Sequence, residues 1–121
     1  MEWTMDNWKS LQQFWESFSI PAYDENTVPD SAVMPYITYE AGESGFDTMT
    51  ALTASIWYYS SSWAAISQKA DEINDRLRYG GIVTNGIWIK RGTPFAQRMS
   101  DPDARIRRIV LNVEVEYLER G

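Results

Sequence analysis

Histidine, the commonest general base near neutral pH, and cysteine, the source of thiolate nucleophiles, are both absent from the 121 residues. Without histidine no ordinary Ser–His–Asp triad can form. Without cysteine there is no thiolate nucleophile, disulfide or thiolate metal site. A Ser–Lys arrangement has few possible bases, and none of them lies in a recognisable motif: Lys9, Lys69 and Lys90. The composition therefore argues against an enzyme.

The remaining polar patterns favour structural roles. Glu114 and Glu116 share one face of a predicted strand, as a pair of catalytic carboxylates can, but solvent-facing glutamates on such strands are far commoner. Asp101 and Asp103 could hold a hard cation, yet the rest of an EF-hand loop is missing and turn chemistry explains them better. No glycine cluster has the spacing of a phosphate-binding loop. We predict no catalytic, cofactor-binding or metal-binding residue.

One basic cluster stands out, Arg105, Arg107 and Arg108, with Arg98 close by in the sequence. Arg105 and Arg107 share a face if a strand begins that early. The cluster could contact an acidic neighbour, or DNA passing through a pore. A solvated strand end that balances Glu114 and Glu116 on the adjacent strand is slightly favoured, because surface charges usually contribute little.

The net charge of −6 is unevenly distributed along the chain. Residues 1–60 carry nine acidic residues and one basic residue, whereas residues 61–121 carry eight acidic and ten basic ones. The acidic half would repel duplex nucleic acid, which argues against a groove-binding protein. Such asymmetry most often has no functional meaning. Its alternative meaning is that acidic and basic faces of identical subunits meet head to tail.

Two segments have helical periodicity. Apolar residues recur at spacings of three and four within residues 8–18, before Ile20-Pro21 ends the pattern, and again from Trp63 to Leu77. Thr4 or Asp6 could cap the first helix, and serines 60–62 could cap the second. Glu72 and Arg76 are spaced for an ion pair on the second helix.

The strands are predicted from alternation and β-forming residues. They cover 35–40, 46–59 after a turn at 41–45, 87–90 and 105–118. Residues 82–84 form either the first strand of a hairpin at Asn85-Gly86 or part of one bulged strand. Residues 22–34 are predicted as an acidic surface loop and residues 91–104 as a polar loop.

The predicted fold is therefore α+β, in a single domain spanning residues 1–121. Two helices pack on a mainly antiparallel sheet of four strands, or five if residues 82–84 are a separate strand, in the order α-β-β-α-β-β. Six Trp, seven Tyr and four Phe exceed what one small core needs, so some aromatic residues should face another subunit.

Four segments resemble one family: Val28–Tyr39, Thr53–Leu77, Gly86–Gln97 and Arg107–Tyr117. Together they are similar to the tail terminator proteins of long-tailed bacteriophages, also called tail completion or minor capsid proteins. The resemblance implies a virion subunit that forms a hexameric ring on the last ring of the tail tube. Such a ring stops tail polymerisation and presents a surface to the head connector or stopper protein, while viral DNA only passes through its pore. Similar parts occur in phage-tail-like bacteriocins and gene transfer agents.

The resemblance implies no catalytic residue, and a ring requires two complementary surfaces on each subunit. The acidic loop 22–34 and the basic segment 91–108 are the expected surfaces. Their expected contact residues are Tyr23, Asp24, Glu25, Asp30, Phe95, Met99, Arg105, Arg107 and Arg108.

Two other functions remain open: another neck component such as a stopper, and a small-molecule binding module that uses aromatic residues of the sheet. A small enzyme is the third. The N-terminus lacks the basic region of a signal peptide, and no apolar run approaches the roughly 20 residues of a membrane span. We expect assembly in a bacterial cytoplasm and residence in the virion.

Overall fold

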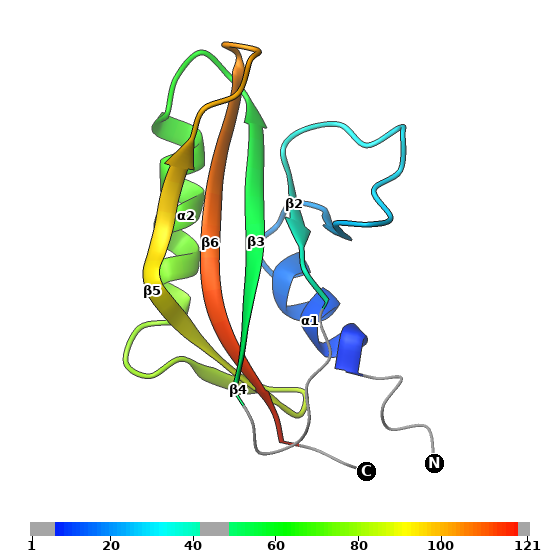
Figure 1. The fold of residues 1–121 in the computed structure, drawn as a ribbon, viewed down its shortest axis with the longest axis vertical. Coiled ribbons are helices and arrows are strands. Elements are labelled where there is room, and N and C mark those ends of the chain that lie inside the picture. Colours follow the sequence, from blue (N-terminus) through cyan, green and yellow to red (C-terminus); the bar gives the residue numbers. More distant parts are fainter. Residues whose placement is uncertain (1–6, 42–48, 119–121) are drawn as a thin grey trace.

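The computed structural model describes residues 7–41 and 49–118, which form one sheet with two helices on the same face (Figure 1). In chain order the elements are α1 (Asn7–Glu16), β1 (Ala22–Asp24), β2 (Tyr36–Tyr39), β3 (Thr50–Tyr59), α2 (Ala64–Arg76), β4 (Ile82–Thr84), β5 (Ile87–Met99) and β6 (Ile106–Tyr117). The α+β class is as predicted, whereas the number of strands and their order are not.

The six strands lie in the order β1-β2-β3-β6-β5-β4. Every neighbouring pair is antiparallel except β1 and β2, which are parallel. The two long partners β3 and β5 flank β6, so the C-terminal strand is central. The register of β5 on β6 shifts between Arg91 and Ala96. This irregularity contains Pro94, which has no N–H for a ladder hydrogen bond and is tolerated at such a bulge.

The core lies between the sheet and the two helices. Alternate residues of β6, from Ile109 to Tyr117, point into it, as predicted. Leu11, Trp15 and Phe18 are also buried, so the predicted apolar face of the first helical segment is confirmed for these residues. The second predicted face is confirmed as well, because Ile66, Ala70, Ile73 and Leu77 are buried, while Trp63 is partly buried against the core.

Two predicted loops are partly strand. Residues 22–24 of the expected acidic loop pair with residues 37–39, an arrangement that three residues without alternation do not indicate. Residues 91–99 of the expected polar loop continue β5, because their backbone pairs with β6 although their side chains are largely exposed. The pair Asn85-Gly86 does form a hairpin, since β4 and β5 pair antiparallel across it.

The ends, ion pairs and caps of the helices differ in part from the predictions. Helix α1 ends at Glu16, earlier than the proline signal indicates, and Ser19 adopts a positive φ of 69° before Pro21. The expected Glu72–Arg76 ion pair is absent from the described residues: Glu72 pairs with Lys69 at 2.9 Å. The expected serine cap is wrong, because the N-cap residue of α2 is Trp63, which makes no side-chain cap hydrogen bond; Ser62, one residue earlier, accepts a hydrogen bond at Oγ from the N–H of Ala64 at 3.0 Å. Thr4, Asp6, the Trp8 side chain and residues 42–48 of the expected turn and strand lie outside the described part.

In the described part of the chain, no helix is long and apolar enough to cross a membrane.

Candidate interaction surfaces

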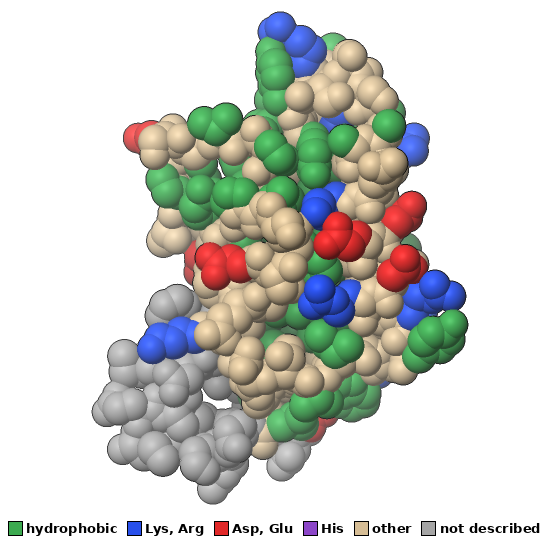
Figure 2. Space-filling view, turned by 180° about the vertical axis from the view of Figure 1, so that it is seen from behind, with side chains coloured by type: hydrophobic (Ala, Val, Ile, Leu, Met, Phe, Trp, Pro, Cys, Tyr) green, Lys and Arg blue, Asp and Glu red, His purple; other side chains and the backbone are tan. Residues whose placement is uncertain are grey.

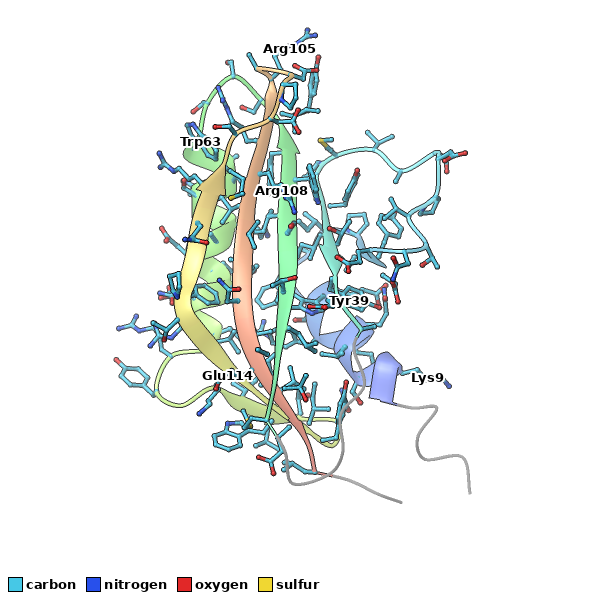
Figure 3. All side chains as sticks on the ribbon, viewed as in Figure 1. Lys9, Tyr39, Trp63, Arg105, Arg108 and Glu114 are labelled. Carbon is cyan, nitrogen blue, oxygen red and sulfur yellow. The ribbon has the colours of Figure 1, made fainter. Side chains whose placement is uncertain are left out.

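Four arginines gather at the end of the sheet where β5 finishes and β6 begins. The antiparallel register brings Arg98 opposite Ile109 and Met99 opposite Arg108, while Arg105 and Arg107 lie at and just after the intervening turn. Figure 3 shows Arg105, Arg108 and the neighbouring Trp63 in this same half of the molecule. We call these four residues, Arg98, Arg105, Arg107 and Arg108, the arginine group.

Every guanidinium of the arginine group lies against an aromatic ring. The distances from Cζ to the ring centroid are 4.8 Å for Arg98 and 5.1 Å for Arg107, both to Trp63. Arg105 lies 5.1 Å from the ring of Tyr59. Arg108 lies 4.7 Å from the ring of Trp57. Cation–π contacts of this kind hold the flexible arginine side chains in defined positions and stabilise each by roughly 0.5–1 kcal/mol at exposed sites.

The arginine group is divided between the two faces of the sheet. Arg108 is opposite Trp57 on β3, and its Nε donates a hydrogen bond to Ser55 Oγ at 3.1 Å, on the face without helices. Arg107 is opposite Tyr58 on the helix-covered face, where Nη2 donates to the carbonyl oxygen of Ser61 at 2.8 Å. Strand β6 begins at Ile106, so the condition for Arg105 and Arg107 to share a strand face is not met.

Few carboxylates balance the arginine group. Among the described residues its one ion pair joins Arg105 Nε to Asp103 Oδ1, at 3.7 Å. The buried Nε of Arg107 has no hydrogen-bond partner in that part of the chain. We expected Glu114 and Glu116 to neutralise these arginines from an adjacent strand. This prediction is wrong, because both glutamates lie on β6 itself, and Glu114 Oε1 is 3.7 Å from Lys90 Nζ. The arginine group is thus a concentration of positive charge.

The complementary charge lies on Asp24, the last residue of β1, and on the segment that follows it up to β2. We call residues 24–35 the acidic loop. The carboxylates of Asp24, Glu25 and Asp30 form no ion pair with any described residue, although Asp24 Oδ1 accepts a hydrogen bond from the N–H of Asn26 at 2.9 Å. Glu25 and Asp30 are exposed. In Figure 1 this loop projects from the sheet beside β2, at the edge opposite β5.

The three predicted apolar contact residues differ in how far they are available to a partner. Tyr23 is half-buried and packs edge-on against Tyr36, with ring centroids 5.7 Å apart. Phe95 packs against the protein's own core. Met99 is exposed, whereas Val33, which the sequence did not single out, is more exposed still at 77%. Val33 lines a hollow with Ala32, Met34 and Tyr59.

The helix-covered side carries a different charge pattern. Helix α2 bears an ion pair from Lys69 to Glu72, and Asp75 near its end pairs with Arg78. Figure 2 accordingly shows acidic and basic side chains close together at mid-height on this side, and hydrophobic side chains gathered above them on the side of the acidic loop. Paired charges of this kind give α2 little net attraction for a charged partner.

In the described residues no group of three or more acidic side chains is placed so that it could hold a metal ion. Burial raises the pKa of Tyr39 to about 12, and the nearby carboxylates of Asp24 and Glu16 add to this shift. The protonated hydroxyl donates a hydrogen bond to Oε1 of Gln12. Burial also raises the pKa of Tyr58, while Lys69 opposes the shift. Both tyrosines therefore remain protonated and are poor nucleophiles.

A hollow lies between α1 and β1 in the described part of the chain. It is lined by Gln12, Ala22, Tyr23, Asp24, Thr27 and Tyr39. The hydroxyl of Tyr39 donates its hydrogen bond to Gln12 there, and Nε2 of Gln12 donates to the carbonyl oxygen of Ala22 at 2.8 Å. Such internally paired groups leave few polar contacts for a ligand.

Comparison with known proteins adds one finding about the fold. No protein-family model and no curated protein matches the chain. Among solved structures, a chain of the virion of a native gene transfer agent particle is similar, with a TM-score of 0.56 and 16% sequence identity. The match covers 88% of this chain and 93% of that one, so the two share a fold over nearly their whole lengths.

Proposed function

We propose that this chain is a structural virion protein, and specifically the subunit of a ring that closes the head-proximal end of a phage-type tail tube. The observation that carries the proposal is the shared fold with a chain of a gene transfer agent virion, which extends over 88% of this chain. The four segments that resemble tail terminators lie in β2, in β3 and α2, in β5 and in β6, and so make up most of that fold.

The surfaces of the molecule support a subunit that binds copies of itself. The acidic loop and the arginine group are oppositely charged and lie in different parts of the sheet, as a head-to-tail ring requires. The hexameric state, the tail tube protein and the head connector as partners, and passage of viral DNA through the pore follow from the resemblance to tail terminators. They are part of the proposal, as is residence in the tail or neck of a virion assembled in a bacterial cytoplasm.

Polymerisation of tail tube protein provides the test. Purified chain is added to growing tubes, and tube length and tube ends are examined by negative-stain electron microscopy. The proposal predicts that elongation stops and that one end of each tube carries a ring. Tubes that continue to grow without a ring would contradict it.

A stopper in the same neck is the second candidate. It is supported by the same fold match, because that match is to a virion chain without a stated position in the particle. A stopper would bind tails that already carry a terminator and would leave bare tubes growing, so the same experiment separates the two functions.

A further inference from the structure

The acidic loop and part of the arginine group lie at opposite edges of the sheet, at a similar level along the strands. In Figure 1 the loop projects beside β2 in the upper half of the molecule. In Figure 3 Trp63 lies in the upper half at the opposite edge, beside β5. We call this edge of the sheet, beside β5, the Trp63 edge. If copies are placed side by side by rotation about an axis roughly parallel to the strands, the loop of one copy lies against the Trp63 edge of the next.

The Trp63 edge is accessible to a partner. Strand β4 pairs only with Ile87–Ile89, so among the described elements no strand flanks the rest of β5 on its outer side. The guanidinium groups of Arg98 and Arg107 are both fixed against the ring of Trp63, and neither has a carboxylate within 4 Å in the described residues. We call Trp63, Arg98 and Arg107 the Trp63 patch.

The remaining arginines are less suited to this contact. Arg108 lies on the other face of the sheet, against Trp57 and Ser55. Arg105 already has a carboxylate partner in Asp103. On the opposite edge, the exposed carboxylates of Glu25 and Asp30 have no cation of their own in the described part of the chain. Guanidinium and carboxylate groups form strong, directional charge-assisted hydrogen bonds.

We infer that the Trp63 patch of one copy binds the acidic loop of the next, with Glu25 and Asp30 facing Arg98 and Arg107. This inference rests on the proposed ring, and it gives that ring its lateral contact. The contact is heterologous, because each copy contributes its loop on one side and its patch on the other. It closes into a ring when a whole number of equal rotations between copies completes one full turn.

Engineered cysteines test the contact directly, because the natural chain has none. Asn26→Cys lies beside Glu25 on the loop, and Ala96→Cys lies two residues from Arg98 on β5; both positions are exposed and both substitutions leave the charged groups intact. We call the double variant the loop–edge pair. Under oxidising conditions it should form covalent trimers and larger species. Each single variant can form only dimers, since it has one thiol.

The matched control carries Asn26→Cys with Asp71→Cys, which places the second thiol on the exposed side of α2. At equal millimolar concentration we expect at least about tenfold more trimers and larger species from the loop–edge pair, because a specific contact raises the effective concentration of the thiols. Equal yields from the two pairs would overturn the inference.

Charge reversal in the same loop–edge cysteine background provides a second readout. Glu25→Arg with Asp30→Arg in one variant, or Arg98→Glu with Arg107→Glu in another, should each lower the yield of cross-linked multimers about tenfold, because like charges then face each other. An equimolar mixture of the two variants should recover the yield, since each loop then meets an oppositely charged patch. A mixture no better than either variant alone would overturn the inference.

The outcomes separate this contact from the proposed function. If purified chain caps growing tubes while the loop–edge pair gives no more multimers than its control, the inference fails and the ring function survives. If the multimers form but tubes are not capped, the contact survives and the ring function fails. Protection of the thiol at position 96 by tube protein alone would assign the edge to the tube and overturn the inference.

Discussion

Trp63 should be energetically coupled to Arg98, although the two residues lie on different elements. Trp63→Leu removes the ring against which Arg98 and Arg107 lie, at 4.8 and 5.1 Å from its centroid. Each of the two cation–π contacts contributes roughly 0.5–1 kcal/mol, so losing both should lower the free energy of unfolding by about 1–2 kcal/mol. The smaller leucine side chain also covers less of the core, which adds about 1 kcal/mol.

A double-mutant cycle isolates the cation–π part of that loss. The free energies of unfolding of Trp63→Leu, Arg98→Ala and the double variant are measured by urea denaturation followed by circular dichroism. Because packing losses appear in the single variants, the coupling term should be about 0.5–1 kcal/mol. Trp88→Leu combined with Arg98→Ala is the matched control, because Trp88 lies against Lys90 and should be additive with Arg98. A Trp63–Arg98 coupling below about 0.3 kcal/mol would refute the reasoning.

Three further predictions concern stability and its dependence on pH. Tyr39→Phe should lower the free energy of unfolding by about 1–2 kcal/mol in urea denaturation, because Gln12 loses a buried hydrogen-bond donor. Because the pKa of Tyr39 rises from 10.0 to about 12 on folding, the contribution of this residue to stability should be constant below pH 10 and should be lost as the pH rises to 12. Over that range the natural chain should therefore lose more stability than Tyr39→Phe. Gly81→Ala should cost at least about 2 kcal/mol, since its Cβ would collide with the backbone oxygen of Ile89, and Gly80→Ala, which has open space, about 1 kcal/mol; equal thermal-unfolding midpoints for the two variants would contradict this.

The elements that could be predicted from the sequence are those with long, regular patterns. The spacing from Ile66 to Leu77 and the alternation from Ile109 to Tyr117 each repeat several times, so burial of one face followed directly from them. Local turn chemistry at Asn85-Gly86 predicted the hairpin as one of two alternatives, and the antiparallel pairing of β4 with β5 decides against the single bulged strand. The α+β class then follows, because two amphipathic helices and strands with one apolar face must bury those faces against each other.

The missed strands depend on partners far away in the sequence. β1 has three residues, and its parallel pairing with β2 leaves no local signature. The second half of β5 has a polar, proline-containing sequence and is held by backbone pairing with β6 across a bulge. Periodicity reports the burial of side chains, so a strand with largely exposed side chains is not visible to it.

The sequence predicted which charged residues form the two surfaces, but not which groups those residues contact. The acidic loop and the cluster from Arg105 to Arg108 were visible in the sequence. The division of the arginine group between two faces was not, because it depends on the register that puts Arg108 opposite Trp57 and Arg107 opposite Tyr58. Trp63 was predicted on the core-facing side of the second helix, and its additional contacts with two guanidinium groups required the fold.

The central proposal is that copies of this chain bind one another at the end of a tail tube. Electron microscopy of tail tubes grown with and without the purified chain tests it most directly. The account predicts tubes of arrested length, each with a ring at one end. Tubes of unchanged length with bare ends, in the presence of folded chain, would contradict it.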